Sequence, residues 1–222
     1  HLDIPQNIQA ELINKYRKIE IAKLSSNPPS KNMIDQVINL INQSVRPVII
    51  SGHGVIRSNG TDALLECAQL LGAPVATSRS GIGSINSSSE HSVGMLGFYG
   101  TSTASEAVSS ADLLLVIGCS LGEQTTYGWK PNLFAEGSKI IQVDIDPKQP
   151  NHVYTVDMGV QCDAACFLSS LAARLGSKTK SSWYSKKPIP MSAKNNPTQG
   201  LSAADVLPVS YTHLTQPTTP YV

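Results

Sequence analysis

The stretch Lys139-Ile-Ile-Gln-Val-Asp-Ile-Asp-Pro147 decides the fold class of this chain, together with the earlier run Ala111-Asp-Leu-Leu-Leu-Val-Ile-Gly118. Both are short apolar runs that end in small or polar residues. A run of this kind suits a strand that is buried on both faces of a parallel sheet. Ligands of open parallel sheets bind outside the carboxyl ends of the strands. We therefore expect Asp144 and Asp146 at a ligand-binding edge, where they can accept hydrogen bonds from hydroxyls such as those of a ribose.

Strand-like and helix-like patterns alternate along the chain on both sides of these runs. Strands are expected at residues 46–51, 72–77, 111–118 and 139–145, helices at 30–44, 61–71, 102–110 and 164–175, and glycine-rich loops at 78–86 and 94–101. Ser30 and Asp163 are the expected N-caps of the first and last of these helices. The alternation implies right-handed crossovers. The predicted fold class is therefore α/β, a Rossmann-like parallel sheet with helices on both faces.

Composition excludes several classes of protein. The 222 residues are 41% hydrophobic, 15% charged and 5% aromatic, which is the profile of an α/β core rather than of a disordered or fibrous chain. The net charge of +1 gives no electrostatic reason to expect nucleic acid as a partner. No apolar run approaches the length of about 18 residues that a membrane span needs. The four cysteines lack zinc-type spacing, so we expect buried thiols, no metal site and a cytoplasmic location.

The two ends of the chain differ in character from its middle. His1-Leu-Asp-Ile-Pro5 has no initiator Met and no signal-peptide pattern, so it reads as the middle of a longer protein. After residue 176, Lys, Ser, Pro and Asn dominate to about residue 199, which is typical of a linker. Residues 207–222 have no periodicity and resemble translated adaptor sequence. We take that tail as non-native, a hypothesis that resequencing of the source DNA tests.

Three glycine-containing segments follow expected strands. Gly52-His-Gly54 lets a backbone approach a ligand, but Arg57 occupies the third position of the G-x-G-x-x-G fingerprint, so a simple NAD motif is not expected. The backbone amides of Ser78-Arg-Ser-Gly-Ile-Gly83 and Gly97-Phe-Tyr-Gly-Thr101 could hold a pyrophosphate or an adenosine. The alternative for all three segments is an ordinary tight turn.

Side chains that could carry catalysis are scattered. His53, His91 and His152 are far apart in sequence, and no nucleophile elbow or Ser/His/Asp order is present, so we interpret them as loop or surface residues. Trp129 and Tyr127 could line a pocket, although ordinary packing is the simpler interpretation. The sequence thus assigns no catalytic residue.

The order and spacing of these motifs resemble a known family over roughly residues 30–175. The pattern resembles the central domain of thiamine diphosphate-dependent enzymes, with the acetolactate synthase-like branch the nearest. The segments that carry the resemblance are Arg46-Pro-Val-Ile-Ile-Ser-Gly-His-Gly54, Leu71-Gly-Ala-Pro-Val-Ala-Thr77, Gly94-Met-Leu-Gly-Phe-Tyr-Gly-Thr101, Ala111-Asp-Leu-Leu-Leu-Val-Ile-Gly118 and Val143-Asp-Ile-Asp-Pro147.

The resemblance implies a domain organisation and an activity. Residues 1–29 would be the exit from a pyrimidine-binding domain, 30–176 the central α/β domain, and 177–206 a linker toward a diphosphate-binding domain, followed by the non-native tail 207–222. The family's activating Glu and its Gly-Asp-Gly…Asn metal motif belong to the other two domains, so thiamine diphosphate and Mg²⁺ would bind outside this chain. The whole protein would be a homo-oligomeric decarboxylase or carboligase acting on a 2-keto acid, and this chain alone would be inactive.

The resemblance also implies a nucleotide cleft, which in this branch holds FAD. By motif position, the cofactor-binding residues are Gly52, Gly54, Gly81, Gly97, Tyr99, Gly100, Thr101, Asp144, Ile145, Asp146 and Asp163. The chain departs from the flavin pattern where the family has a His (Tyr99), a Lys (Ile82) and an Arg-Phe-Asp-Asp-Arg run (Ser120-Leu-Gly-Glu-Gln124). FAD, an ADP-type nucleotide, CoA and a bare scaffold therefore stay open.

Two other classes of protein compete with this interpretation. One is a non-catalytic nucleotide-binding module with a Rossmann-like sheet. The other is an NAD-dependent deacylase, which would need a catalytic His and usually a four-Cys zinc site, and the cysteine spacing argues against it.

Overall fold

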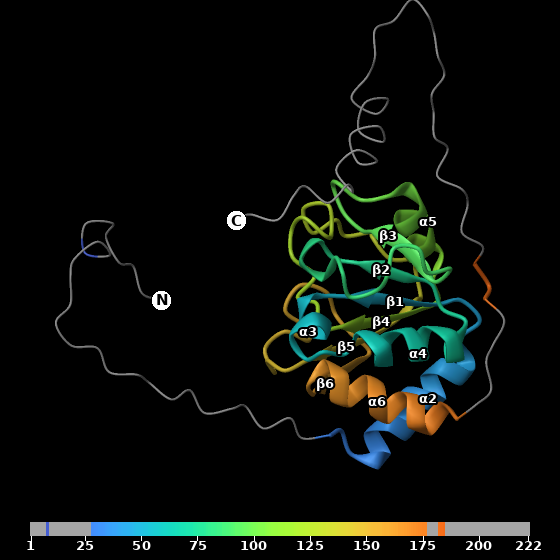
Figure 1. Ribbon diagram of the computed structural model, residues 1–222. Helices are drawn as coiled ribbons and strands as arrows, with labels where there is room; N and C mark the ends of the chain where they lie inside the picture. Colours follow the sequence, from blue (N-terminus) through green and yellow to red (C-terminus); the bar gives the residue numbers. More distant parts are fainter. Residues whose placement is uncertain (1–7, 9–27, 177–181, 185–222) are drawn as a thin grey trace, which may run out of the picture.

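The protein is built on one six-stranded sheet. The computed structural model describes Ile8, residues 28–176 and residues 182–184. Its strands are β1 (Pro47–Ser51), β2 (Val75–Thr77), β3 (Ser92–Met95), β4 (Leu113–Ile117), β5 (Lys139–Asp144) and β6 (Met158–Gln161). They stand in the order β3-β2-β1-β4-β5-β6, and every neighbouring pair is parallel (Figure 1). The rest of the expected domain exit and linker, and all of the expected non-native tail, lie outside these residues.

Helices connect and cover the strands. They are α2 (Lys31–Gln43), α3 (His53–Arg57), α4 (Thr61–Leu71), α5 (Ser102–Ser110) and α6 (Ala164–Leu175), with a 3₁₀ turn η1 (Arg79–Gly81). The predicted N-caps are confirmed: Ser30 accepts from the amide of Met33, and Asp163 accepts from that of Cys166. In the described part of the chain, no helix is long and apolar enough to cross a bilayer.

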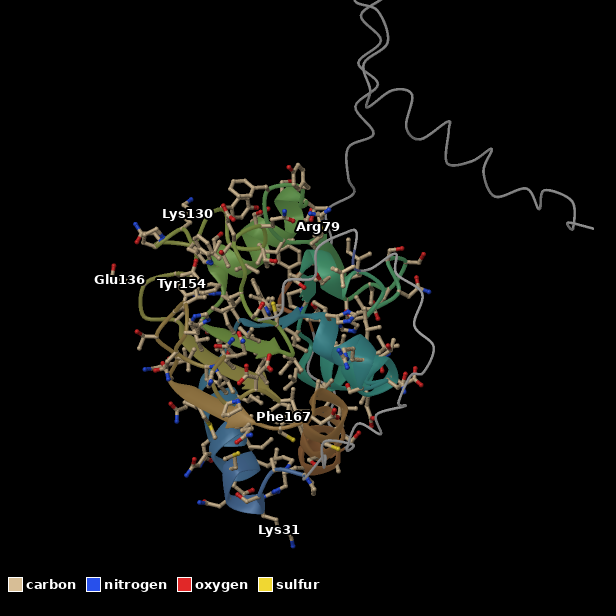
Figure 2. All side chains as sticks on the ribbon, turned by 90° about the vertical axis from the view of Figure 1, so that its left-hand side faces the viewer. Lys31, Arg79, Lys130, Glu136, Tyr154 and Phe167 are labelled. Carbon is tan, nitrogen blue, oxygen red and sulfur yellow. The ribbon has the colours of Figure 1, made fainter. Side chains whose placement is uncertain are left out.

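Each face of the sheet carries its own apolar core. Because successive side chains of a strand point to opposite faces, Ile49, Leu115 and Ile141 lie on one face and Val48 and Leu114 on the other. The first core also takes the apolar stripes of α2, α4 and α6, whose Phe167 is fully buried (Figure 2). The second core takes α5. Helices on both faces, and with them the predicted fold class, are confirmed.

The strand order creates a switch point at the centre of the sheet. From β1 the chain moves outward through β2 and β3, and then returns by α5 to β4 on the other side of β1. The loops that follow β1 and β4 therefore diverge from two adjacent carboxyl ends. Such a divergence is where open α/β sheets leave a crevice for a ligand.

Two short strands and one short helix were not expected. The loop expected at 94–101 begins inside β3, and β6 lies in a stretch with no strand expectation. Both are edge strands in which only part of the side chains are buried, so neither shows the continuous apolar run of β4. The turn expected at Gly52-His-Gly54 is the beginning of α3.

An aromatic pair beyond α6 packs back onto the domain. Trp183 donates from its indole Nε1 to the carbonyl of Pro47 at 2.9 Å, and Tyr184 donates from its hydroxyl to the carbonyl of Thr103 at 3.2 Å. Both rings pack against the core that α5 covers, the face opposite to α6. The two residues lie in the segment that the sequence assigns to a linker, so the packed part of the chain reaches past Gly176.

Removing the Trp183 ring is expected to destabilise the domain. Trp183→Ala should lower the free energy of unfolding by about 2 kcal/mol, because a half-buried ring and a hydrogen bond are lost together. Trp183→Phe keeps an aromatic ring but removes the hydrogen bond, so it should lower the free energy of unfolding by about 1 kcal/mol. Denaturant titration measures both values.

Trp129→Ala is the matched control, because the Trp129 side chain is 51% exposed. It should change the free energy of unfolding by less than about 0.5 kcal/mol. Equal effects of the Trp183 and Trp129 substitutions would contradict an anchoring role for Trp183.

Candidate ligand site at the carboxyl edge of the sheet

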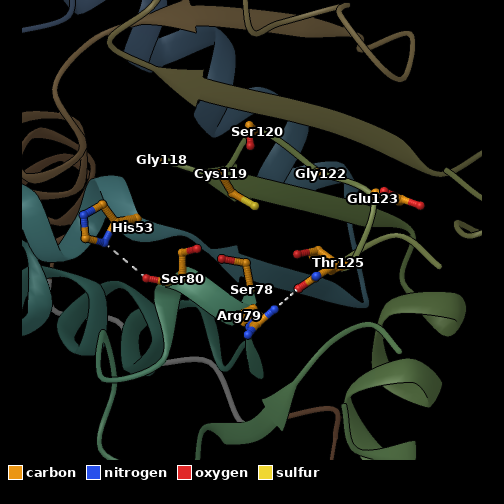
Figure 3. A pocket seen from close by; sticks show the side chains of 11 residues that line it. His53, Ser78, Arg79, Ser80, Gly118, Cys119, Ser120, Gly122, Glu123 and Thr125 are labelled. Carbon is orange, nitrogen blue, oxygen red and sulfur yellow. Dashed lines mark hydrogen bonds between the residues drawn. The ribbon is translucent and has the colours of Figure 1, made fainter. Parts of the chain in front are cut away.

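A polar cavity of about 310 Å³ opens at the switch point. It is bounded by the ends of β1, β2 and β4 and by the loop that follows β4, with His53 at one end and Arg79 and Thr125 at the other (Figure 3). Its lining residues are His53, Ser78, Arg79, Ser80, Gly118, Cys119, Ser120, Gly122, Glu123, Gln124 and Thr125. Most of the lining side chains carry hydroxyl, amide or charged groups that could orient a ligand.

Gly52 and Gly54 let two backbone segments cross in contact. The amide of Gly52 donates to the carbonyl of Ile117 at 2.9 Å, and the amide of Gly54 donates to that of Gly118 at 3.0 Å. A Cβ on Gly52 would lie 2.1 Å from the Gly118 carbonyl oxygen, and one on Gly54 would lie 2.7 Å from the Gly118 Cα. The tight-turn interpretation therefore accounts for both glycines, and their amides bond within the protein.

The other predicted glycines also stand where protein backbone approaches. An added Cβ would lie 2.3 Å from the Ser51 carbonyl oxygen at Gly81, 2.0 Å from the Gln124 carbonyl oxygen at Gly97, and 2.2 Å from the Met95 carbonyl oxygen at Gly100. Gly81 thus brings the loop after β2 onto the end of β1, Gly97 brings the loop after β3 onto the loop after β4, and Gly100 closes a turn against β3. These glycines are required by loop packing whether or not a ligand binds.

Thr101 and Tyr99 have different surroundings. Thr101 caps α5: its Oγ1 accepts from the amide of Ala104 at 3.1 Å and donates to the carbonyl of Val93 at 2.7 Å. Tyr99 is 76% exposed beside the exposed ring of Phe98, which meets Tyr127 edge to face. Tyr127 packs against the core that α5 covers and hydrogen-bonds Ser105, whereas Trp129 is 51% exposed, and neither residue lines the cavity.

The acidic residues of the opening stretch stand at the end of β5. The Asp144 carboxylate accepts from the Asp146 amide at 3.0 Å, and burial raises the pKa of this half-buried carboxyl. The amide of Lys148, 2.9 Å from the Asp146 carboxylate, lowers the pKa of Asp146, which is fully exposed. Ile145 between them is 43% exposed. Asp163 is occupied as the cap of α6.

None of the predicted cofactor-binding residues, all of which the structure describes, lines the cavity; they surround it or lie beyond it. Contact of these residues with a ligand stays a prediction. The cavity is instead lined by residues next to the predicted glycines, such as His53 and Ser80. The ring Nδ1 of His53 lies 3.2 Å from the carbonyl oxygen of Ser80. Sequence analysis missed Arg79, Cys119 and Thr125. The available signal was their position in the loops that follow β2 and β4 at the switch point.

The charged groups of the cavity are few. Arg79 donates from Nη1 to the side-chain oxygen of Gln124, and Glu123 lines the same cavity with an exposed side chain. Cys119 is 4% exposed, and burial raises its pKa. A neutral thiol is a poor nucleophile, so Cys119 does not turn this cavity into a site of covalent catalysis.

Fold and cavity together define the class: an open doubly wound α/β domain with a polar crevice at its switch point, as in nucleotide-binding Rossmann-type domains. The family is shown by comparison of sequences. The model of the thiamine pyrophosphate enzyme central domain matches residues 34–171, and the chain belongs to this family.

Curated relatives agree with this assignment. The chain is 34% identical over 181 residues to a protein of Methanococcus aeolicus named "Probable acetolactate synthase large subunit". The aligned region covers 79% of this chain and 30% of the relative. It is 34% identical to "Acetolactate synthase 1, chloroplastic" of Zea mays, over 82% of this chain and 29% of the relative. The chain thus spans about three tenths of the length of the curated relatives it matches.

The crossing at Gly52 is expected to tolerate no side chain. Gly52→Ala should lower the free energy of unfolding by about 3 kcal/mol, because the new methyl meets backbone atoms that cannot move aside. Gly122→Ala is the control, since its Cβ would meet only the Ser120 Oγ at 3.9 Å. Denaturant titration should show little change for the control; a Gly52→Ala protein as stable as the control would contradict the close crossing.

Replacing Asp144 is expected to stabilise the fold at neutral pH. The pKa of the Asp144 carboxyl is higher in the folded protein than in the unfolded chain. The free energy of unfolding therefore falls as the pH rises from about 3.9, the unfolded pKa, through the raised folded pKa. Asp144→Asn should therefore raise the thermal midpoint at pH 7, and the gain should vanish below about pH 3.9. Asp146→Asn, whose parent carboxyl has a lowered pKa, should give no gain. A lower midpoint for Asp144→Asn at pH 7 would contradict the assigned pKa direction.

Proposed function

We propose that this chain is the central domain of a thiamine diphosphate-dependent enzyme that acts on a 2-keto acid, as an acetolactate synthase does. The observation that carries the proposal is the family match across residues 34–171, which spans the sheet from α2 to α6. The names of the relatives support the acetolactate synthase-like branch. They favour this interpretation over a separate nucleotide-binding module.

The chain contributes structure rather than reacting groups. When bound, thiamine diphosphate supplies the ylid that adds to a keto carbon and promotes loss of carbon dioxide. Among the described residues, no group of three or more His, Cys, Asp or Glu side chains could hold a metal ion. The role of the described residues in the proposal is to hold the domain together and to offer the crevice at the switch point.

Homo-oligomeric assembly and a cytoplasmic location complete the proposal. The first rests on the resemblance to the family, and the second on the composition and cysteine usage of the chain. The name of the Zea mays relative includes the word chloroplastic, so the compartment differs among relatives. Fractionation of the source cells and light scattering of the longer protein test these two parts.

Turnover of a 2-keto acid tests the function. A protein expressed from the longer coding sequence should consume pyruvate or another 2-keto acid only when thiamine diphosphate and Mg²⁺ are supplied. The 222-residue chain should show no turnover under the same conditions. Activity of the chain alone would overturn its scaffold role, and a longer protein with no cofactor-dependent turnover of any 2-keto acid would overturn the proposed function.

A further inference from the structure

We propose that three exposed aromatic side chains, Phe98, Tyr99 and Trp129, form a docking surface for the domain that follows this one in the longer protein. These three residues are called the aromatic patch. The proposal rests on the proposed function in one respect, because it takes this chain as one domain of a longer enzyme. The partner is a protein surface, and no ligand of the crevice is involved.

The aromatic patch brings together side chains from two loops. Phe98 and Tyr99, in the loop after β3, are 55% and 76% exposed, and Trp129, in the loop after β4, is 51% exposed. A Cβ on Gly128 would lie 3.8 Å from the Phe98 ring, so the two loops meet at this point. Large apolar side chains gathered at the surface of a domain indicate a contact site.

The backbone of the loop after β4 holds Trp129 at the surface in an unfavourable conformation. Tyr127, Gly128 and Trp129 have φ angles of 55°, 75° and 56°, a left-handed run that is unfavourable for the two residues with a side chain. The Tyr127 ring packs on the core and its hydroxyl bonds Ser105, while the amide of Trp129 donates to Thr126 Oγ1 at 3.2 Å. Strain that is fixed in this way by its surroundings is typical of functional sites.

The size of the aromatic patch favours a partner in the same polypeptide over a second copy of the chain. With about 150–250 Å² for each aromatic side chain, the exposed fractions correspond to roughly 300–450 Å². A stable complex of separate proteins buries about 800 Å² on each partner. Two domains joined by a linker need less, because they meet at a high effective concentration. The aligned regions cover only 30% and 29% of the two relatives, so a longer protein of this kind has room for such a domain.

The path of the chain selects the domain that follows over the one that precedes. The chain enters the sheet through α2, which packs on the core shared with α4 and α6. After α6, Trp183 and Tyr184 pack on the opposite face, on the core that α5 covers. Tyr127 packs on that same core, and Phe98 and Tyr99 lie just before α5. The chain therefore leaves the described part of the domain on the side that carries the aromatic patch.

The chemistry of the aromatic patch describes the surface that would cover it. Aromatic side chains at interfaces combine a large apolar area with a polar group that seeks a hydrogen bond. Tyr99 carries a hydroxyl and Trp129 an indole N–H, so the facing surface should be flat and apolar with acceptors at its edge. Lys130, the next residue, is exposed and projects from the surface, so an acidic side chain of the partner suits this position (Figure 2).

Hydroxyl-radical footprinting with mass spectrometry tests the proposal on the 222-residue chain and on the longer protein. The oxidation rates of Tyr99 and Trp129 should be about fivefold lower in the longer protein, because docking removes both rings from water. Equal rates in the two proteins would overturn the proposal. Protection that appears in the 222-residue chain when it is concentrated would also overturn it, because the partner would then be a second copy.

Lysine cross-linking identifies the domain that covers the aromatic patch. Lys130, next to Trp129, should form cross-links with the domain that follows this one in the longer protein. Lys139 is the control, because it is an exposed lysine at the opposite edge of the sheet, and it should form none with that domain. Cross-links of Lys130 that reach only the preceding domain would contradict the proposed partner.

A double substitution tests whether docking depends on the rings. In the longer protein, Tyr99→Ala with Trp129→Ala should raise the oxidation rate of Phe98 to its value in the 222-residue chain. Val45→Ala is the matched control, because it removes a 71% exposed side chain before β1, and Phe98 should stay protected in it. A thermal melt should show that both variants are folded, and a Phe98 ring still protected in the double variant would refute the docking role.

These readouts do not depend on turnover, so failure of this proposal and failure of the proposed function are distinguishable. A longer protein that protects the aromatic patch but turns over no 2-keto acid would overturn the proposed function alone. A longer protein that turns over a 2-keto acid and leaves the patch as reactive as in the 222-residue chain would overturn the docking surface alone.

Discussion

The close backbone crossing between the turn after β1 and the end of β4 is the constraint on which the carboxyl edge depends. Gly52 and Gly54 bond to Ile117 and Gly118 across adjacent strands, and no side chain fits between them. This contact places the end of β4, and with it the loop that follows, against the beginning of α3. The loop after β3 then packs against that loop through Gly97, and the loop after β2 reaches it through the hydrogen bond from Arg79 to Gln124. The loops at the carboxyl edge are thereby closely packed around the crevice.

The central strands could be predicted because they are almost completely buried, and the longer helices because each has an apolar stripe. Leu113–Ile117 is buried along its whole length, so it reads as one apolar run, and α2 shows an apolar stripe behind the Ser30 cap. The edge strands β3 and β6 could not be predicted in the same way. Their side chains are only partly buried, and they depend on pairing with a neighbour that local sequence does not reveal.

The position of the site could be predicted more closely than its lining. The cavity lies at the carboxyl edge of the sheet, where a ligand was expected, because strand order fixes that edge, and ligand binding there stays a prediction. The glycines that marked it serve loop packing, and the residues beside them line the cavity. Arg79 could not be assigned from sequence, because its role depends on Gln124, which is 45 residues away in the chain.

Amide hydrogen exchange at Gly52 and Gly54, followed by NMR, tests most directly whether the crossing is a fixed internal contact. We predict that both amides exchange as slowly as those of β1 and β4, and that adding ADP or FAD leaves these rates unchanged. Exchange as fast as that of the exposed Gly137 amide would contradict the account, because it would mean that these donors are open to solvent and to a ligand.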